Sequence, residues 1–422
     1  MEMPERTQAG PSGSPGMTRR IVWGPVIGFG LVSLAADIVS DGARPLAGPL
    51  LAQLGASALL VGLVTGGAEA AAQGLRLVFG PWSDRTRRYW TFTLAGYALT
   101  AVCVPLLALA PLVGAAGLVL AAVLIIGDRV GKAVRSPAKT VLLAAAAKPV
   151  GRGRGFAVHK SLDLTGALLG PLLVSAVLAA TGLISAALAV LAIPAAAALA
   201  LLVWLRRRVQ DPGSGRPAAS AATAGAADPA GAAEAAGHPP SLLTGSFALF
   251  AVAGFFWSAG LVAFGVISFH LTTTVAVPVA VVPLMYAGAM AAAALGALAT
   301  GVLYDRAGAA VLLGLPLLIA AVPVLALAPG AGLVLAGVLV WGVATGIQDS
   351  TVKALIADLV PEFRQGTAYG VFAAFQGAGA LAGGALYGAL FDSRPLLIAA
   401  VAFLQLSAFV VLLVILRKSR RP

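Results

Sequence analysis

Charged side chains interrupt long apolar runs in this sequence, and their spacing follows the helical repeat. Asp128, Lys132 and Arg135 fall at intervals that place them on one face of a helix. A carboxylate beside basic groups can bind and release a proton when its surroundings change. A charged group at membrane depth is costly to bury and usually serves a function. These residues therefore predict a proton site beside a polar wall that contacts a small solute.

Two further helical faces carry such groups. One joins Glu69 to Arg76, and the other joins His159 to Asp163, where histidine can relay a proton near neutral pH. The proton-coupling candidates, with Asp128 and Asp163 first, are Asp128, Asp163, His159, Asp37 and Glu69. The substrate-cavity candidates are Arg129, Lys132, Arg135, Arg76, Asp349 and Gln376.

The same charges have a second interpretation as structural ion pairs at helix ends. That interpretation is favoured for Lys139, Lys160 and Asp358, which we expect close to the membrane surface. For Asp128, Arg135 and Asp163 a functional role is favoured, since we expect them deeper in their helices.

The composition defines the elements that must position these residues. Of 422 residues, 59% are apolar and only 10% are charged, whereas soluble domains carry about 25% charged residues. A membrane-spanning helix needs about 20 apolar residues, so about twelve spans would use this apolar content. The composition excludes a soluble enzyme and a disordered chain, and it predicts an all-α polytopic membrane protein.

Twelve spans can be placed along the chain. They cover residues 22–43, 55–80, 90–110, 114–145, 153–180, 183–205, 245–270, 277–303, 308–328, 331–358, 366–391 and 395–416. The predicted organisation is a disordered tail over 1–20, a six-helix bundle over 21–205, a flexible linker over 206–244, a second six-helix bundle over 245–416 and a basic tail over 417–422. The linker is rich in alanine, glycine, proline and serine, and such a composition cannot form a packed core.

Basic residues decide the orientation. With both termini in the cytoplasm, most of the 28 lysines and arginines fall in cytoplasmic segments. The outer segments keep only Arg44 and Arg394. This distribution follows the positive-inside rule. It predicts a multi-pass protein of the plasma membrane, and it explains the net charge of +12 without a nucleic-acid partner.

The two halves repeat each other. Gly80-Pro81-Trp82-Ser83-Asp84-Arg85 follows the second predicted span, and Gly301-Val302-Leu303-Tyr304-Asp305-Arg306 follows the eighth. Each half also has a pair of glycines four residues apart, Gly166 and Gly170 with Pro171 in the first, and Gly379 and Gly383 in the second. Such glycines allow close helix packing. Parallel repeats of this kind place binding sites between the halves near the bilayer midplane.

The repeated Gly-x-x-x-Asp-Arg motif resembles the loop signature of the major facilitator superfamily (MFS), and the resemblance covers essentially the whole chain. The first, fourth and fifth spans also resemble those of a bacterial efflux subgroup. This resemblance implies that Gly80, Asp84, Arg85 and Arg88, and their second copies Gly301, Asp305 and Arg306, belong to a cytoplasmic gate. The alternative is a basic loop that only sets topology, and it is favoured for Arg306. In addition, Gly166-x-x-x-Gly170-Pro171 resembles an antiporter motif of drug exporters.

The function predicted from these patterns is secondary active transport by alternating access, as proton-coupled export of a small amphipathic compound. Alternatives are an importer or uniporter of a small solute, or a membrane sensor that has lost transport. No phosphate-binding loop or His-Glu-x-x-His motif occurs, so we expect no enzyme activity, no cofactor and no metal. The predicted partners are the solute, protons and the lipid bilayer, and we expect a monomer.

Overall fold

The computed structural model describes residues 15–209, 245–360 and 365–419, and within these ranges the protein contains helices and no strand. The first bundle contains α1 (Pro15–Ala43), η1 (Arg44–Leu46), α2 (Ala47–Gln53), α3 (Ala58–Gly74), α4 (Arg76–Thr86), α5 (Tyr89–Leu106), η2 (Leu107–Leu112), η3 (Gly114–Ala116), α6 (Gly117–Ala147), η4 (Lys148–Val150), α7 (Arg152–Thr181), α8 (Ile184–Ala189) and α9 (Ala192–Arg206). The second bundle contains α11 (Ser246–Gly260), α12 (Phe264–Thr273), α13 (Val281–Ala307), η6 (Gly308–Leu313), α14 (Gly314–Ala326), α15 (Ala331–Leu359), α16 (Gln365–Ala389) and α17 (Arg394–Ser419). The all-α prediction is confirmed.

Ten segments of the described chain are long and apolar enough to cross a membrane. One of them, Val281–Ala326, contains two helices, because α13 ends where Gly308 adopts a positive φ of 61° and η6 leads into α14. α16 is not among the ten segments, since its glycines lower its hydropathy, yet its 25 residues are enough to span a bilayer. The polytopic membrane architecture predicted from the composition is therefore confirmed.

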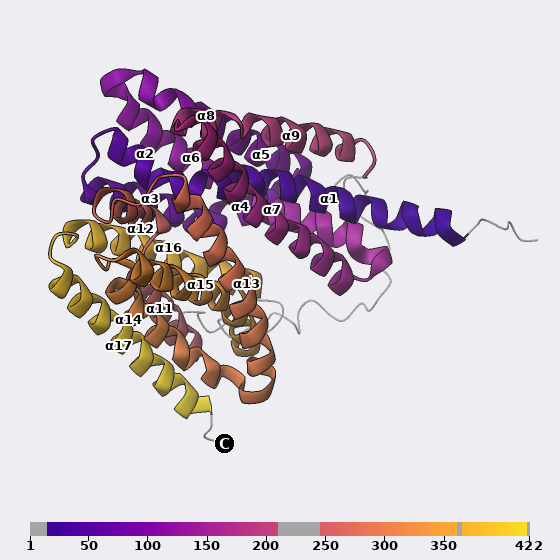
Figure 1. The fold of residues 1–422 in the computed structure, drawn as a ribbon. Helices are drawn as coiled ribbons and strands as arrows, with labels where there is room; N and C mark the ends of the chain where they lie inside the picture. Colours follow the sequence, from indigo (N-terminus) through magenta and orange to yellow (C-terminus); the bar gives the residue numbers. More distant parts are fainter. Residues whose placement is uncertain (1–14, 210–244, 361–364, 420–422) are drawn as a thin grey trace, which may run out of the picture.

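The two bundles lie against each other at one end and diverge toward the other (Figure 1). The ends of the molecule can be named by their residues. The basic end is the one where α1 begins and α9, α13 and α17 end, and the opposite end holds α2 and α12. At the opposite end α12 packs against α2 and α3, which closes that side.

Two predicted segments differ from the structure or lie outside it. Most of the linker expected over 206–244 falls in 210–244, outside the described residues. Of the tail expected over 1–20, the last part is helical, because α1 begins at Pro15. Proline is tolerated at the first helical position, where its missing N–H has no partner in the helix.

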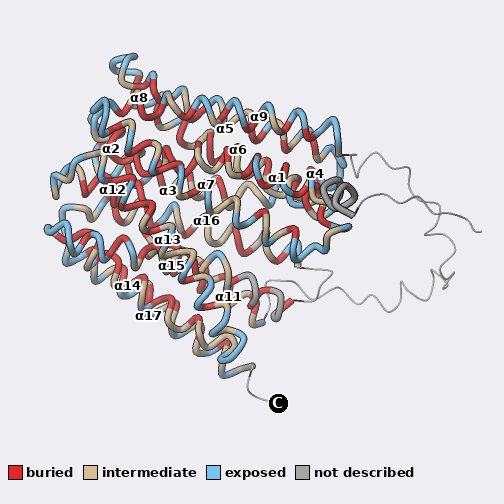
Figure 2. Tube along the Cα trace, turned by 45° about the vertical axis from the view of Figure 1, so that its right-hand side comes forward, coloured by how far each residue is buried: buried red, intermediate tan, exposed pale blue. Residues whose placement is uncertain are grey.

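The surface of the molecule is that of a membrane protein. Buried residues line the contacts between helices, and exposed residues follow the outward faces (Figure 2). Large apolar side chains are among the exposed ones, for example Leu295, Leu298 and Phe403. Lipid tails solvate such side chains without cost, so these faces fit a bilayer.

Glycines bring α3 and α16 into backbone contact across the two bundles. Gly62 and Gly66 of α3 face Gly384 and Ala380 of α16. A Cβ atom at Gly66 would lie 2.7 Å from the carbonyl oxygen of Ala380 and 3.0 Å from Cα of Gly384. This contact, here called the glycine seam, therefore depends on the absence of side chains.

We expect Gly66→Ala to destabilise the protein by about 1–3 kcal/mol, because an added methyl group overpacks the glycine seam. Gly67→Ala is the matched control, since a Cβ there meets only Cδ1 of Leu381 at 3.9 Å. Thermal unfolding of the purified protein in detergent checks this. Equal midpoints for the two variants would show that the seam adjusts without cost.

Candidate functional site

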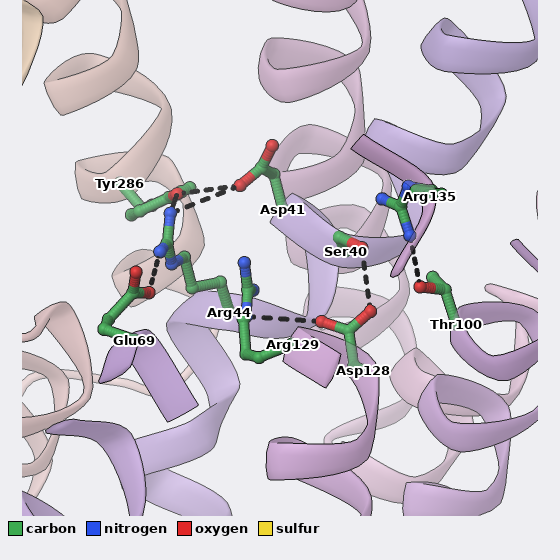
Figure 3. A network of polar contacts seen from close by, with 9 residues as sticks. All are labelled: Ser40, Asp41, Arg44, Glu69, Thr100, Asp128, Arg129, Arg135 and Tyr286. Carbon is green, nitrogen blue, oxygen red and sulfur yellow. Dashed lines mark hydrogen bonds and ion pairs between the residues drawn. The ribbon is translucent and has the colours of Figure 1, made fainter. Parts of the chain in front are cut away.

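Arg44 is the centre of a polar contact between the bundles (Figure 3). Its guanidinium pairs with Glu69 of α3, and its Nη1 lies 3.7 Å from Oδ1 of Asp41. The same Nη1 donates a hydrogen bond of 3.3 Å to the hydroxyl of Tyr286, which in turn donates one of 3.0 Å to Asp41. Tyr286 is fully buried and belongs to α13 of the second bundle. These four residues, here called the bridge, connect α1, α3 and α13.

Asp128 and Arg129 form a second buried group on α6. Asp128 accepts a hydrogen bond of 3.0 Å from Ser40, and its other carboxylate oxygen lies 3.3 Å from Nε of Arg129. Both residues are almost fully buried, with 4% and 5% exposure. The Nη1 atom of Arg129 has no hydrogen-bond partner in the structure. This guanidinium is therefore only partly satisfied.

A cavity lies between the bridge and this second group, with an empty volume of about 560 Å³. Its polar lining comes from the first bundle and includes Ser40, Arg44, Glu69, Asp128 and Arg129. Its apolar lining includes Leu46, Leu50, Leu107, Ile125 and, from the second bundle, Phe264. Such a site can hold a small molecule that has both a polar and an apolar part.

Two carboxyl groups meet closer to the basic end, where α1 packs on α7. Gly166 and Gly170 of α7 contact the backbone at Leu34 and Ile38 of α1. This close approach brings the side chain of Asp37 on α1 near that of Asp163 on α7.

Basic groups surround this carboxyl pair. Lys160 donates a hydrogen bond of 2.7 Å to Asp163. Farther along α1, Ser33 accepts a hydrogen bond of 3.0 Å from Lys139 and lies 2.9 Å from Nε2 of His159. The predicted candidates Asp163, Asp37 and His159 thus belong to one region, and Lys139 and Lys160 are part of it.

The remaining substrate-cavity candidates are not among the residues that line the cavity. Arg135 is buried against α5, where its Nη1 donates a hydrogen bond of 2.5 Å to Thr100 and its guanidinium lies over the ring of Tyr97. Asp349 is exposed on α15, and Gln376 is half-buried on α16. Arg76 and Lys132 are half-buried and have no ion-pair partner within the described part of the chain.

Both copies of the Gly-x-x-x-Asp-Arg motif lie at the basic end. The glycines of the two copies do not contact the opposite bundle. Gly80 and Gly301 have no neighbouring atom within 4 Å of an added Cβ. Asp84 is exposed and accepts a hydrogen bond of 3.5 Å from Tyr89 of its own bundle. The charged members of both copies, Arg85, Arg88, Asp305 and Arg306, are exposed as well.

The second pair of glycines makes a contact that corresponds to the first. Gly379 and Gly383 of α16 contact the backbone at Phe255 and Ala259 of α11. In the first bundle Pro171 is buried beside Gly170. Both bundles therefore use a glycine pair on their fifth spanning helix to approach their first.

Sequence reasoning missed the bridge. The sequence pattern places Arg44 in an outer loop. In the structure η1 and α2 continue the first span beyond the end of α1, and Arg44 forms ion pairs there. The spacing of three residues between Asp41 and Arg44 was a signal for an ion pair on one helix face. Tyr286 carried no comparable signal, because its partners lie far away in the sequence.

The described residues contain no group of three histidine, cysteine or carboxylate side chains that could hold a metal ion. Two helical bundles that span a membrane and enclose a charged cavity define a membrane transporter. A sequence profile described as Major Facilitator Superfamily matches residues 29–384 and 247–422, so the chain belongs to that superfamily.

Relatives and solved structures agree with this family. The chain is 48% identical over 403 residues to the uncharacterized protein Rv2265 of Mycobacterium tuberculosis, with 93% of each chain covered. A mutant of the nucleoside transporter NupG shares the fold with a TM-score of 0.71 and 13% identity, over 93% of this chain and 99% of that one. A bacterial homologue of the human lysosomal transporter Spinster, solved in an inward-facing and unoccupied conformation, has a TM-score of 0.65, 16% identity and 96% coverage of both chains.

Tyr286→Phe should weaken the bridge, because it removes two hydrogen bonds to charged groups, each of which contributes about 1.5–3 kcal/mol. The bundles should then separate more often at the opposite end. With the native cysteine removed by Cys103→Ser, labelling of Ala47→Cys by an impermeant maleimide from that side should rise at least about tenfold, the equivalent of about 1.4 kcal/mol or more.

Tyr387→Phe is the matched control. This tyrosine is also fully buried, but its hydroxyl donates a hydrogen bond of 2.7 Å to Gly260 within the second bundle. An equal rise in labelling for both variants, or none for Tyr286→Phe, would contradict the role assigned to the bridge.

Proposed function

We propose that this transporter exports a small amphipathic compound in exchange for protons, by alternating access across the plasma membrane. The observation that supports the proton coupling is the close packing of α1 on α7, which brings the carboxyl groups of Asp37 and Asp163 near each other. Two carboxylates close together in a low-dielectric site disfavour ionisation of both, so such a pair can hold one proton.

The basic groups around the two carboxyl groups provide a way for the shared proton to be released. Lys160 donates a hydrogen bond to Asp163, and Lys132 and Asp41 are further charged groups that interact with Asp37. If the basic end is cytoplasmic, as the positive-inside distribution supports, the bundles are open to the cytoplasm. A proton taken up from the outside would then be released when Lys160 replaces it beside Asp163.

The direction of transport is supported by the similarity of Gly166-x-x-x-Gly170-Pro171 to the antiporter motif of drug exporters. An importer or uniporter would use the same cavity without this exchange. A transport-dead sensor would have no need for buried charges, and this chain retains Asp37, Asp128 and Arg129 inside its bundle. The first experiment is a growth screen of a deletion strain against a compound panel, followed by transport in vesicles with an imposed pH gradient.

Asp37→Asn and Asp163→Asn should each abolish the response of transport to a pH gradient, because one carboxyl alone no longer shares a proton. Substrate exchange without a gradient should remain within about twofold of wild type. Both rates can be measured in inside-out vesicles with the compound found in the growth screen. Asp392→Asn, at an exposed aspartate, is the control.

A structural ion pair gives a different result. In that case Asp163→Asn would lower the thermal midpoint and reduce exchange and gradient-driven transport together. Full gradient-driven transport by both variants would sink the assignment, and Asp128 and Glu69 would be tested next.

We also propose that Asp84 acts at the cytoplasmic gate when that side closes. A carboxylate can then meet the positive end of a helix in the opposite bundle, which an amide does less well. Asp84→Asn should therefore slow turnover roughly twofold to tenfold while insertion is unchanged. Transport initial rates and membrane abundance check this, and unchanged turnover would leave the loop with a role in topology alone.

A further inference from the structure

We propose that the substrate carries an anionic group of the carboxylate or phosphate type, and that Arg129 binds it in the cavity. This inference rests on the proposed transport function and names the class of compound that the cavity accepts. It starts from the partly satisfied guanidinium of Arg129, which is 5% exposed and whose Nη1 has no partner. A buried donor without an acceptor costs about 1–3 kcal/mol, more when it is charged.

None of the carboxylates that line the cavity accepts a hydrogen bond from Nη1 of Arg129. Glu69 is paired with Arg44, and Asp128 accepts from Ser40 and from Nε of Arg129. Asp41, just outside the lining, accepts from Tyr286 and lies beside Arg44. Each carboxylate therefore already has its own donors, and none of them contacts Nη1 of Arg129.

Further positive charge lies outside the cavity, on elements that run from it toward the basic end. Lys132 follows Arg129 on α6 and has no ion-pair partner within the described ranges. Arg76, the first residue of α4, is likewise unpaired there, and its Nε is buried without a hydrogen bond. An anion that entered from the basic end would meet these two side chains before it reached Arg129. Guanidinium groups suit this task because their planar donors match carboxylate and phosphate oxygens.

The guanidinium of Arg129 points into the space between Asp128 and the bridge (Figure 3). The other side of the cavity is apolar, with Leu50, Leu107 and Phe264 in its lining. The arrangement thus fits an anion with an apolar or aromatic body, because Arg129 offers a free donor while the carboxylates already accept from donors of the protein.

Binding to the purified full-length protein in detergent tests the proposal, with three probes that share one ring system. Naphthoate is the anion, naphthylmethylamine the cation and naphthalenemethanol the neutral analogue. Naphthoate should bind at least about tenfold more tightly than the other two, a difference of about 1.4 kcal/mol. Dioctanoyl phosphatidylglycerol is a fourth probe, because a lipid headgroup offers the same anionic chemistry as a free solute.

Arg129→Gln should remove the preference for naphthoate. Because this variant leaves Asp128 with one donor fewer, the charge-balanced double variant Asp128→Asn/Arg129→Gln is measured as well, and it should also lose the preference. Arg208→Gln, at an exposed arginine that stacks on Trp204, is the matched control and should keep it. Arg129-dependent binding of naphthoate or of the lipid supports the site, and the tighter of the two identifies the source of the anion.

Equal binding of the three naphthalene probes, or anion binding that survives both Arg129 variants, would overturn the proposal. These outcomes are separate from a failure of proton-coupled export, because binding is measured without a gradient. Export of a cation or a neutral compound without Arg129-dependent anion binding would refute the anion site alone. Arg129-dependent binding in a protein that ignores a pH gradient would refute the coupling alone.

Discussion

A charge inside a membrane protein must be paired, and in this molecule one face of α1 meets that constraint. Ser33, Asp37, Ser40, Asp41 and Arg44 follow one another at helical spacing from the basic end toward the opposite end. Each contacts a polar group of another helix, from His159 of α7 through Asp128 of α6 to Glu69 of α3. The bridge to Tyr286 of the second bundle ends this stripe. Removing α1 and Arg44 from their place would therefore leave Glu69 of α3 without its ion-pair partner and take a hydrogen-bond partner from Asp128, His159 and Lys139.

The two bundles contribute unequally to the interior. The first bundle supplies the carboxylates and the guanidinium groups, whereas the second supplies an aromatic cluster of Phe264, Tyr286 and Trp341. Its one polar contribution to the bridge is the hydroxyl of Tyr286. An uncharged partner allows the bundles to separate without leaving a buried ion in the second one, since the desolvation penalty of a hydroxyl is far smaller than that of a charge. The glycine seam between α3 and α16 gives the bundles a contact of backbone atoms alone.

The sequence was enough to predict the features that depend on local pattern. Apolar length predicted the spanning helices, and the glycine pairs at 166 and 170 and at 379 and 383 marked faces that the structure uses for close packing. The features it could not predict depend on pairs between distant helices. Asp37 and Asp163 were both proton candidates, but nothing in their spacing indicated that they meet. Arg44 was assigned to a loop because the apolar run ended there, although ion pairs hold it inside.

The close packing of α1 on α7 connects the proposed proton site to the cavity. Asp37 faces the carboxyl of Asp163 on α7, and one helical turn farther along, Ser40 and Asp41 reach Asp128 and the bridge. Because side chains on a single rigid helix move together, a change of charge at Asp37 that shifts α1 also shifts Ser40 and Arg44. At Gly166 and Gly170 the backbones of α7 and α1 approach without a side chain from α7 between them, so at these two positions no rotamer would have to change if α1 moved on α7. Coupling between proton and substrate then needs no long pathway, because both sites lie on the same face of one helix.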